Sequence, residues 1–215
     1  MATYESFLKI NGSVGDLVFY TLNGKNIVRK KSGFNKSAFK KNPAYEKVRQ
    51  NSSEFGHCSK IGKLIRQSIK NFIIYAEDPL LYQKFAKLMT EIKDLDFISE
   101  RGKRTVKNGI DTEKGKSALR NFCFGKIDNI SVSTKVVLNL WDNSLFLSEA
   151  MTDEIVITTI KIDFDRYSTE TYEQIIQMEK QKNELVFTKC FTDDHSILHF
   201  ITLKKDGEII QMGFA

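Results

Sequence analysis

The histidines and cysteines of this chain are the residues whose types most directly suggest metal chemistry. His195 and His199 are four residues apart and follow two aspartates, a spacing that could hold a metal ion on a helix. The segment HSILHF around them predicts a strand instead, where four residues at about 3.3 Å each separate two side chains by about 13 Å. Cys58 follows His57 but has no second cysteine nearby, and the chain contains no CxxC pair. We therefore predict neither a metal site nor a cofactor.

Candidate catalytic patterns are equally weak. The stretch from Ser37 to Lys40 matches S-x-x-K, but a lysine-rich chain produces such matches by chance, and K-T-G and S-D-N elements are missing. The GSVG stretch at residues 12–15 lacks the helix-loop-helix setting in which such a loop clamps a nucleic-acid backbone. Asp163 and Asp165 place two carboxylates on one strand face, which is typical of solvated edge charge. Because no nucleophile, base and stabilising group can be combined, we predict a protein that is not an enzyme.

The basic segment at residues 30–42, KKSGFNKSAFKKN, is the feature with the clearest binding chemistry. Its lysines could lie along phosphates while its two phenylalanines stack on exposed bases. The segment could equally dock on the acidic part of a neighbouring subunit, or it could be a solvated chain that keeps the protein soluble. These three interpretations stay open. The expected partners are accordingly further copies of the chain or other structural subunits, or else DNA or RNA.

Two sets of candidate residues follow from these interpretations. The candidate subunit contacts are Phe19, Tyr20, Arg29, Lys30, Lys31, Phe34 and Phe39. The alternative nucleic-acid contacts are Lys30, Lys31, Lys36, Lys40, Lys41, Lys103, Arg104 and Lys107.

The elements that must position these residues begin with a hairpin. The runs DLVFYTL and KNIVRKK flank Asn23-Gly24, and an Asn-Gly pair between two such runs is a strong hairpin signal. Both faces of this hairpin are largely apolar, with Phe19 on one face and Tyr20 on the other. An isolated two-stranded ribbon is marginal in water, so we expect the hairpin to dock on its own domain or on a neighbouring molecule.

Helices and then strands are predicted for the rest of the chain. We expect helices that start near Asn42-Pro43 and Asp78-Pro79, the second reaching about Phe97, and an exposed linker at residues 99–117. From Ile130 onward, period-two runs predict antiparallel strands in a sandwich-like arrangement, with a crossover helix or long loop at residues 167–182. The predicted class is α+β. Its expected regions are 1–41 (hairpin and basic arm), 42–126 (helical) and 127–215 (antiparallel β domain).

Composition limits the class of protein further. The chain has 215 residues, of which 41% are apolar, enough to bury a core. No apolar run approaches about 18 residues, and the stretch MATYESFLKI is unlike a secretory signal, so we predict no membrane association. Three widely spaced cysteines are typical of a reducing compartment. We expect a location in the cytoplasm, or in the virion if the protein is encoded by a phage.

The net charge of +6 is distributed unevenly. Residues 1–126 hold 25 Lys and Arg against 12 Asp and Glu, a net charge of +13, whereas residues 127–215 hold 8 against 15, a net charge of −7. Such a chain can bind a polyanion with one end, or it can stack head to tail with copies of itself.

The N-terminal segment also carries a family resemblance. The positions that match are Gly12, Gly15, Val18, Gly24, Val28 and Arg29 in the hairpin and Arg49 and Phe55 in the following helix. Over about residues 11–70 the chain resembles a family of uncharacterised bacterial and phage proteins with a Gly-x-x-Gly-x-x-Val hairpin, although Lys31-Ser32-Gly33 replaces the proline that often follows. The resemblance implies a small structural or binding protein, possessing no catalytic residues to transfer and compatible with a phage or prophage origin. We therefore predict a non-enzymatic assembly protein, with nucleic-acid binding as the alternative.

Overall fold

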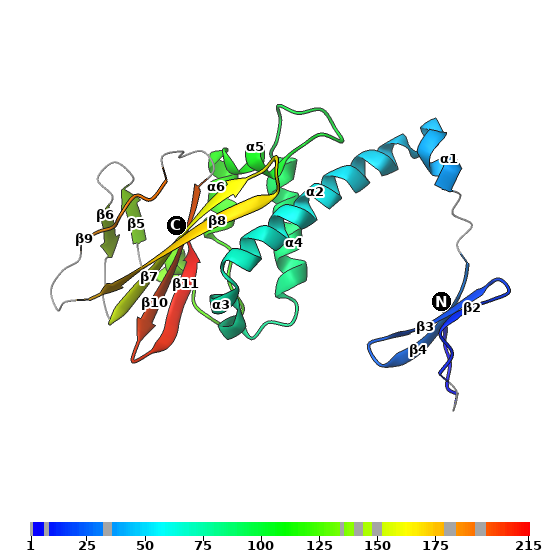
Figure 1. The fold of residues 1–215 in the computed structure, drawn as a ribbon, viewed down its shortest axis with the longest axis horizontal. Helices are drawn as coiled ribbons and strands as arrows, with labels where there is room; N and C mark the ends of the chain where they lie inside the picture. Colours follow the sequence, from blue (N-terminus) through cyan, green and yellow to red (C-terminus); the bar gives the residue numbers. More distant parts are fainter. Residues whose placement is uncertain are drawn as a thin grey trace. The chain divides into compact units, whose positions relative to one another are not determined.

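The structure is a computed structural model in which the chain divides into two compact units, Met1–Arg49 and Gln50–Ala215 (Figure 1). It describes residues 2–6, 9–31, 36–133, 136–139, 144–147, 152–178, 184–191 and 197–215. The architecture combines helices with antiparallel sheets, which confirms the predicted α+β class.

A four-stranded antiparallel sheet forms most of the first unit. Its strand order is β1-β4-β3-β2, and its strands are β1 (Ala2–Thr3), β2 (Gly12–Val14), β3 (Leu17–Leu22) and β4 (Lys25–Lys30). The predicted hairpin is the β3–β4 pair, which turns at Asn23 (φ 50°) and Gly24 (φ 76°). Two successive residues with positive φ are typical of a type I′ turn, so this Asn-Gly pair sets the register of the hairpin.

The basic segment after β4 differs from its prediction as a loop or extended arm. Residues Lys36–Lys41 form the short helix α1, and the 3₁₀ helix η1 (Pro43–Tyr45) follows. A helix forms because KSAFKK lacks glycine and proline and contains residues of good helix propensity. Nη1 of Arg49 then donates hydrogen bonds to the carbonyls of Phe39 (2.6 Å) and Asn42 (3.0 Å) near its end. The Asn42 side chain caps η1 by accepting a backbone N–H at 2.9 Å, as the helix-start signal predicted.

Helix α2 (Glu46–Ser68) leads into the second unit. The helices after it are α3 (Lys70–Ile73), η2 (Ile74–Ala76), α4 (Leu81–Asp94), α5 (Val106–Ile110), α6 (Glu113–Arg120) and α7 (Ile130–Ser133). Helix α4 begins at Leu81, two residues after the predicted Asp78-Pro79 start. Leu80 is its N-cap residue without a side-chain cap, and Oδ1 of Asp78 accepts the Leu80 N–H at 2.9 Å in the preceding turn. The helix ends at Asp94, three residues before the predicted end at Phe97.

The segment 99–117, predicted as a linker, contains α5 and the first half of α6. The hydroxyl oxygens of Thr105 and Thr112 cap the two helices by accepting backbone N–H groups at 3.3 and 3.0 Å. Gly109, which suggested a loop, lies where a Cβ atom would be only 2.0 Å from the carbonyl oxygen of Ile92 in α4. The glycine therefore serves close helix packing rather than an exposed linker.

Two antiparallel sheets form the β part of the second unit. The larger has the order β11-β10-β7-β8, with strands β7 (Glu154–Asp163), β8 (Ser168–Gln177), β10 (Ile197–Lys205) and β11 (Glu208–Phe214). The smaller has the order β5-β6-β9, with strands β5 (Val136–Asn139), β6 (Ser144–Leu147) and β9 (Glu184–Val186). The predicted Asp206-Gly207 hairpin joins β10 to β11, and both residues have positive φ.

Two segments of the β region differ from their predictions. Residues 167–182, expected as a helix or a long loop, contain β8, which pairs with β7 along its whole length. Threonine, tyrosine and isoleucine favour a strand once a buried strand is available for pairing, and this outweighs the glutamates. The run from Ile130, expected as a strand, begins with α7. The cause is Asn129, whose Oδ1 accepts the N–H of Ser131 at 2.8 Å and so starts a helical turn.

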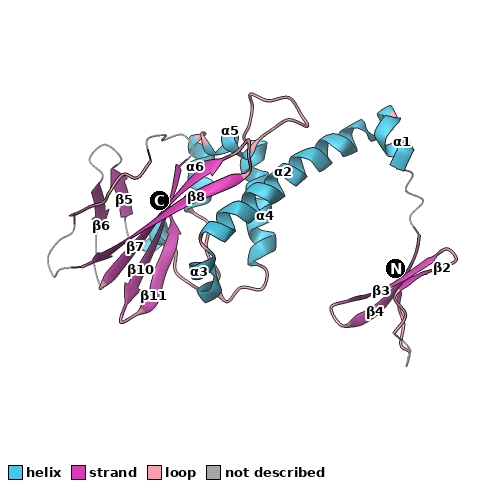
Figure 2. Cartoon of the chain, viewed as in Figure 1, coloured by secondary structure: helices cyan, strands magenta, loops and turns pink. Residues whose placement is uncertain are grey.

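The central strands β7 and β10 are covered on both faces (Figure 2). On one face, residues of α2 to α6 form a core with the sheet around a cluster of aromatic rings that includes Phe72, Phe124 and Phe200. On the other face, Leu145 of β6 and Leu185 of β9 bring the smaller sheet into a second core. The predicted boundary at residue 126 therefore does not separate two structures: residues from Gln50 onward form one layered unit, while residues 42–49 belong to the first unit.

Candidate functional site

The sheet of the first unit is largely without a core. Among its described residues only the side chain of Ile27 is buried, at 7% exposure. Val14 is 63% exposed, Leu22 50% and Leu17 42%. A sheet needs a hydrophobic face packed on something to be stable in water. This sheet therefore presents apolar surface that another molecule can cover.

The predicted subunit contacts lie mostly on this sheet. Phe19 and Tyr20 are successive, half-buried residues of β3, and the ring of Phe19 meets that of Tyr4 edge-on, with ring centroids 5.6 Å apart. Arg29 and Lys30 are exposed at the end of β4. Phe19 and Tyr20 point to opposite faces, so the predicted set does not form one patch.

The other predicted contacts lie after the sheet. Lys31 is exposed, and its N–H donates to the Asp16 carbonyl at 2.6 Å. The ring of Phe39 is half-buried against that of Tyr45, with centroids 5.8 Å apart, so it is occupied within its own unit. Phe34 lies outside the described residues.

The alternative nucleic-acid contacts are divided between the two units. Lys36, Lys40 and Lys41 are exposed on α1, in a unit that holds ten Lys and Arg against three Asp and Glu, a net charge of +7. Lys103 and Lys107 are exposed in the second unit. Arg104 is committed elsewhere, since its guanidinium binds a buried carboxylate.

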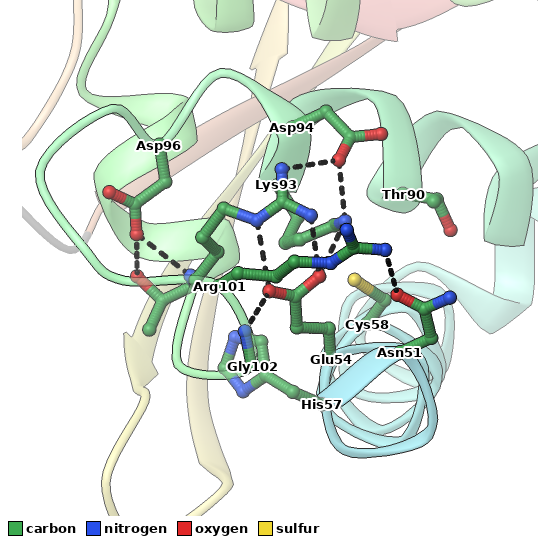
Figure 3. Close-up of polar contacts among 12 residues, drawn as sticks. Asn51, Glu54, His57, Cys58, Thr90, Lys93, Asp94, Asp96, Arg101 and Gly102 are labelled. Atoms are coloured by element: carbon green, nitrogen blue, oxygen red, sulfur yellow. Dashed lines mark hydrogen bonds and ion pairs between the residues drawn. The ribbon is translucent and has the colours of Figure 1, made fainter. Parts of the chain in front are cut away.

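That carboxylate belongs to Glu54 and is the centre of a polar cluster that sequence reasoning missed (Figure 3). Glu54 is 3% exposed and Lys93 5%. Oε2 of Glu54 lies 2.9 Å from Lys93 Nζ, and Arg104 donates to both carboxylate oxygens at 2.7 and 2.9 Å. The Gly102 N–H adds a hydrogen bond to Oε1 at 2.6 Å, and Asp94 accepts from Arg104 at 2.9 Å.

The contacts in this cluster stabilise the charged form of Glu54. Hydrogen bonds from Arg104 outweigh the effect of burial and, with Lys93 and the Gly102 N–H, lower the pKa of Glu54 to about 2. A carboxylate with every partner site occupied is a structural tie, here joining α2, α4 and the loop at residues 99–105. Its sequence signal was a lone charge on the buried stripe of α2, four residues before Cys58.

The neighbouring Asp96 organises the same loop. Its Oδ1 accepts the N–H groups of Ile98 and Ser99 at 3.0 and 2.9 Å, and its Oδ2 accepts that of Thr105 at 2.9 Å. Burial acts to raise the pKa of Asp96, but these hydrogen bonds hold it well below its usual range.

His57 and Cys58, adjacent in sequence, do not act as a pair. His57 Nε2 accepts the N–H of Val106 at 3.0 Å, so its Nδ1 carries the proton and donates to the Tyr167 hydroxyl at 3.0 Å. Burial, together with Lys60, lowers the pKa of His57. The Cys58 thiol faces the Met89 carbonyl instead, and burial raises its pKa to about 11.

The predicted histidine candidates bring no ligand set together. Nδ1 of His199 lies 3.3 Å from the hydroxyl oxygen of Thr159, while His195 lies outside the described residues. Within the described part of the chain, no three His, Cys, Asp or Glu side chains are grouped so as to hold a metal ion.

The two edges of the larger sheet differ. A backbone N–H of β11 donates to the Asp128 carbonyl at 3.1 Å, so residues near 128 cover that edge. Strand β8 spans ten residues at the other edge, where its backbone forms no backbone–backbone hydrogen bond with a described residue outside β7; the Thr188 N–H does donate to the side-chain Oε1 of Gln174 at 2.8 Å. It carries Glu170 and Glu173 but no Lys or Arg, and Ile175 is 60% exposed. A long edge without a bulge or proline is open to pairing with another strand.

Comparisons with known proteins leave the family open. No family model matches the chain, and no curated protein or solved structure matches it either. The resemblance to bacterial and phage proteins stays a prediction. None of the helices in the described ranges is long and apolar enough to cross a membrane.

Proposed function

We propose that this chain is a non-enzymatic assembly protein whose N-terminal unit contacts neighbouring subunits. The observation that carries the proposal is the sheet of residues 2–30, in which Ile27 is the single buried side chain of the described residues. A partner that covers Val14, Leu17 and Leu22 would supply the core that this sheet lacks.

The partner we propose is a second copy of the chain, and its contact surface is the edge strand β8. The first unit has a net charge of +7, and Arg29 and Lys30 lie exposed at the end of β4. Strand β8 offers Glu170, Glu173 and an open backbone edge. Opposite charge would bring the two together, and strand pairing would hold them. In keeping with the family resemblance, we place the assembly in a phage or prophage virion, with the subunit synthesised in the cytoplasm.

The direct test is size-exclusion chromatography with light scattering on the full chain, freed of nucleic acid. We expect oligomers that grow with protein concentration at about 0.1 M salt and diminish at about 1 M, where the Debye length falls to about 3 Å. Deletion of residues 1–41 should leave a folded monomer, because Asn42 and both cores of the second unit remain. A full chain that stays monomeric at high concentration and low salt would rule the proposal out.

The role of β8 has its own test. We expect the double variant Glu170→Lys/Glu173→Lys to weaken association at least tenfold, because it replaces attraction to the basic unit by repulsion. The matched control is Glu100→Lys/Glu113→Lys, which reverses two carboxylates whose side chains are 82% and 85% exposed. Equal weakening by both pairs would show that net charge, not this edge, controls association.

The exposed lysines of α1 favour nucleic-acid binding as a second candidate function. Lys36, Lys40 and Lys41 make no ion pair within the described residues. If they contact phosphates, substituting Lys30, Lys31, Lys40 and Lys41 with Ala should flatten the slope of log affinity against log salt by about 0.7 to 0.9 per lost contact. An unchanged slope would count against this function.

A further inference from the structure

A recess of about 780 Å³ lies on the surface of the second unit, between the end of α2, helix α3 and the start of α4. It forms because the chain turns there: Ile69, Phe72 and Ala76 are buried and anchor the turn. The intervening Ile74 is left 76% exposed and lines the recess. The volume is in the range of small-ligand sites.

Three cationic side chains line this recess. Lys63 and Arg66 lie three residues apart on α2, and Lys70 is the first residue of α3 after the break at Ile69. Lys63 and Lys70 are exposed and form no ion pair with any residue that the structure describes. The acid in the lining, Asp78, is already bound by Lys84 Nζ at 2.6 Å. Positive charge is thus gathered there without a matching carboxylate.

The Arg66 side chain is positioned beside the recess by two contacts within the second unit. Its Nε donates to the Gly62 carbonyl at 3.0 Å, and its guanidinium carbon lies 4.3 Å from the ring centroid of Tyr82. Partial burial lowers the pKa of Arg66, which means that its charge has lost some hydration without gaining a carboxylate partner in the described structure. An anion bound in the recess would replace the lost water around the Arg66 guanidinium by accepting a charge-assisted hydrogen bond from it.

The rest of the lining suits a flat, partly apolar ligand. Tyr82 is 55% exposed although Arg66 lies against its ring, and Ile74 adds an aliphatic surface. Gln67 and Asn71 contribute exposed side-chain amides, which can donate to and accept from the edge of a base.

We propose that this recess binds a nucleotide unit, with its phosphate at Lys63, Arg66 and Lys70 and its base against Tyr82 and Ile74. A simple anion would use the cations but would leave the exposed ring and both amides without a role. The unit can belong to a free nucleotide or to a single strand of nucleic acid. The site uses residues of the second unit only, so it is independent of the proposed assembly and of the lysines on α1.

The test is fluorescence anisotropy on the full chain with a labelled oligothymidylate of about ten nucleotides, competed by AMP. We expect Lys63→Gln/Lys70→Gln to weaken binding and to flatten the salt slope by about 1.4, because two contacts with single-stranded phosphates are lost. The matched control Lys87→Gln/Lys114→Gln removes the same charge from exposed positions outside the recess.

Recognition of the base is tested by Tyr82→Leu. We expect the affinity to fall about tenfold, as for the loss of one stacked base. Competition by AMP shows that a free nucleotide can occupy the recess, whereas oligonucleotide binding without AMP binding shows that the ligand is a strand. Either result supports the proposed site if the recess variants lose that binding. Affinity that survives both recess variants, equal loss in the control, or no detectable binding overturns the proposal. If only Lys40→Gln/Lys41→Gln weakens binding, the recess proposal is also overturned, and the alternative that α1 binds nucleic acid is supported instead.

Discussion

A carboxylate as buried as that of Glu54 is tolerated only when cations and N–H groups replace the water it loses. Arg104, Lys93 and the Gly102 N–H do so, and together they connect α2, α4 and the loop before α5. Removing the charge would leave two cations around an amide. We therefore expect Glu54→Gln to lower the free energy of unfolding by about 3 kcal/mol, measured by urea denaturation.

The matched control is Glu113→Gln, which breaks the pair with Lys116 at an 85% exposed side chain and should change stability by less than about 0.5 kcal/mol.

The pH dependence of stability gives a second measurement of the same interaction. The pKa of Glu54 is about 2 in the folded chain and 4.5 in the unfolded chain, so its contribution is complete above pH 4.5. About 3 kcal/mol should be lost as the pH falls from 4.5 to 2, and Glu54→Gln should lack that part of the loss. If the free energy of unfolding depends on pH in the same way in the unmodified chain and in Glu54→Gln, the low pKa of Glu54 is contradicted.

Two glycines in helices of the second unit should respond in opposite ways to alanine, because the packing around them differs. At Gly109 in α5 a Cβ atom would lie 2.0 Å from the Ile92 carbonyl oxygen, whereas at Gly56 in α2 it would have no neighbour within 4 Å. We expect Gly109→Ala to destabilise the chain by about 1 to 3 kcal/mol through separation of α4 and α5. Gly56→Ala should stabilise it by up to about 1 kcal/mol. Thermal and urea unfolding of the two variants make the comparison, and equal effects would contradict the close approach of the helices.

The elements that the sequence predicted correctly are those whose signals are local. Asn23-Gly24 and Asp206-Gly207 specify their hairpins by turn chemistry alone, and α4 carries an amphipathic pattern on its own. Strand β8 was missed because its pairing with β7 decides its conformation, and α5 because Gly109 is a packing contact rather than a turn. Helix α1 was missed because KSAFKK was interpreted by its charge, although several of its residues have good helix propensity.

The candidate sites divide in the same way. The lysines at residues 30–41 were visible as a charge run, whereas the partners of Glu54 come from positions 39 to 50 residues away in the chain. The recess beside α3 could not be predicted either, because Tyr82 and Lys63 line the same recess only after the chain turns between α2 and α4.

At the scale of the whole molecule, the two units should differ in how their stability depends on neighbours. The second unit has two cores of its own, whereas the sheet of the first buries only Ile27 among its described residues. If a second copy supplies the missing cover, folding of that sheet is linked to association and must depend on protein concentration. Hydrogen exchange should therefore show weak protection of residues 17–30 at low concentration and about 1 M salt, and strong protection at high concentration and about 0.1 M. Protection of β7 should be the same under both conditions and provides the internal control. A sheet protected equally in the dilute monomer would be self-sufficient, and the main reason to expect a partner for it would disappear.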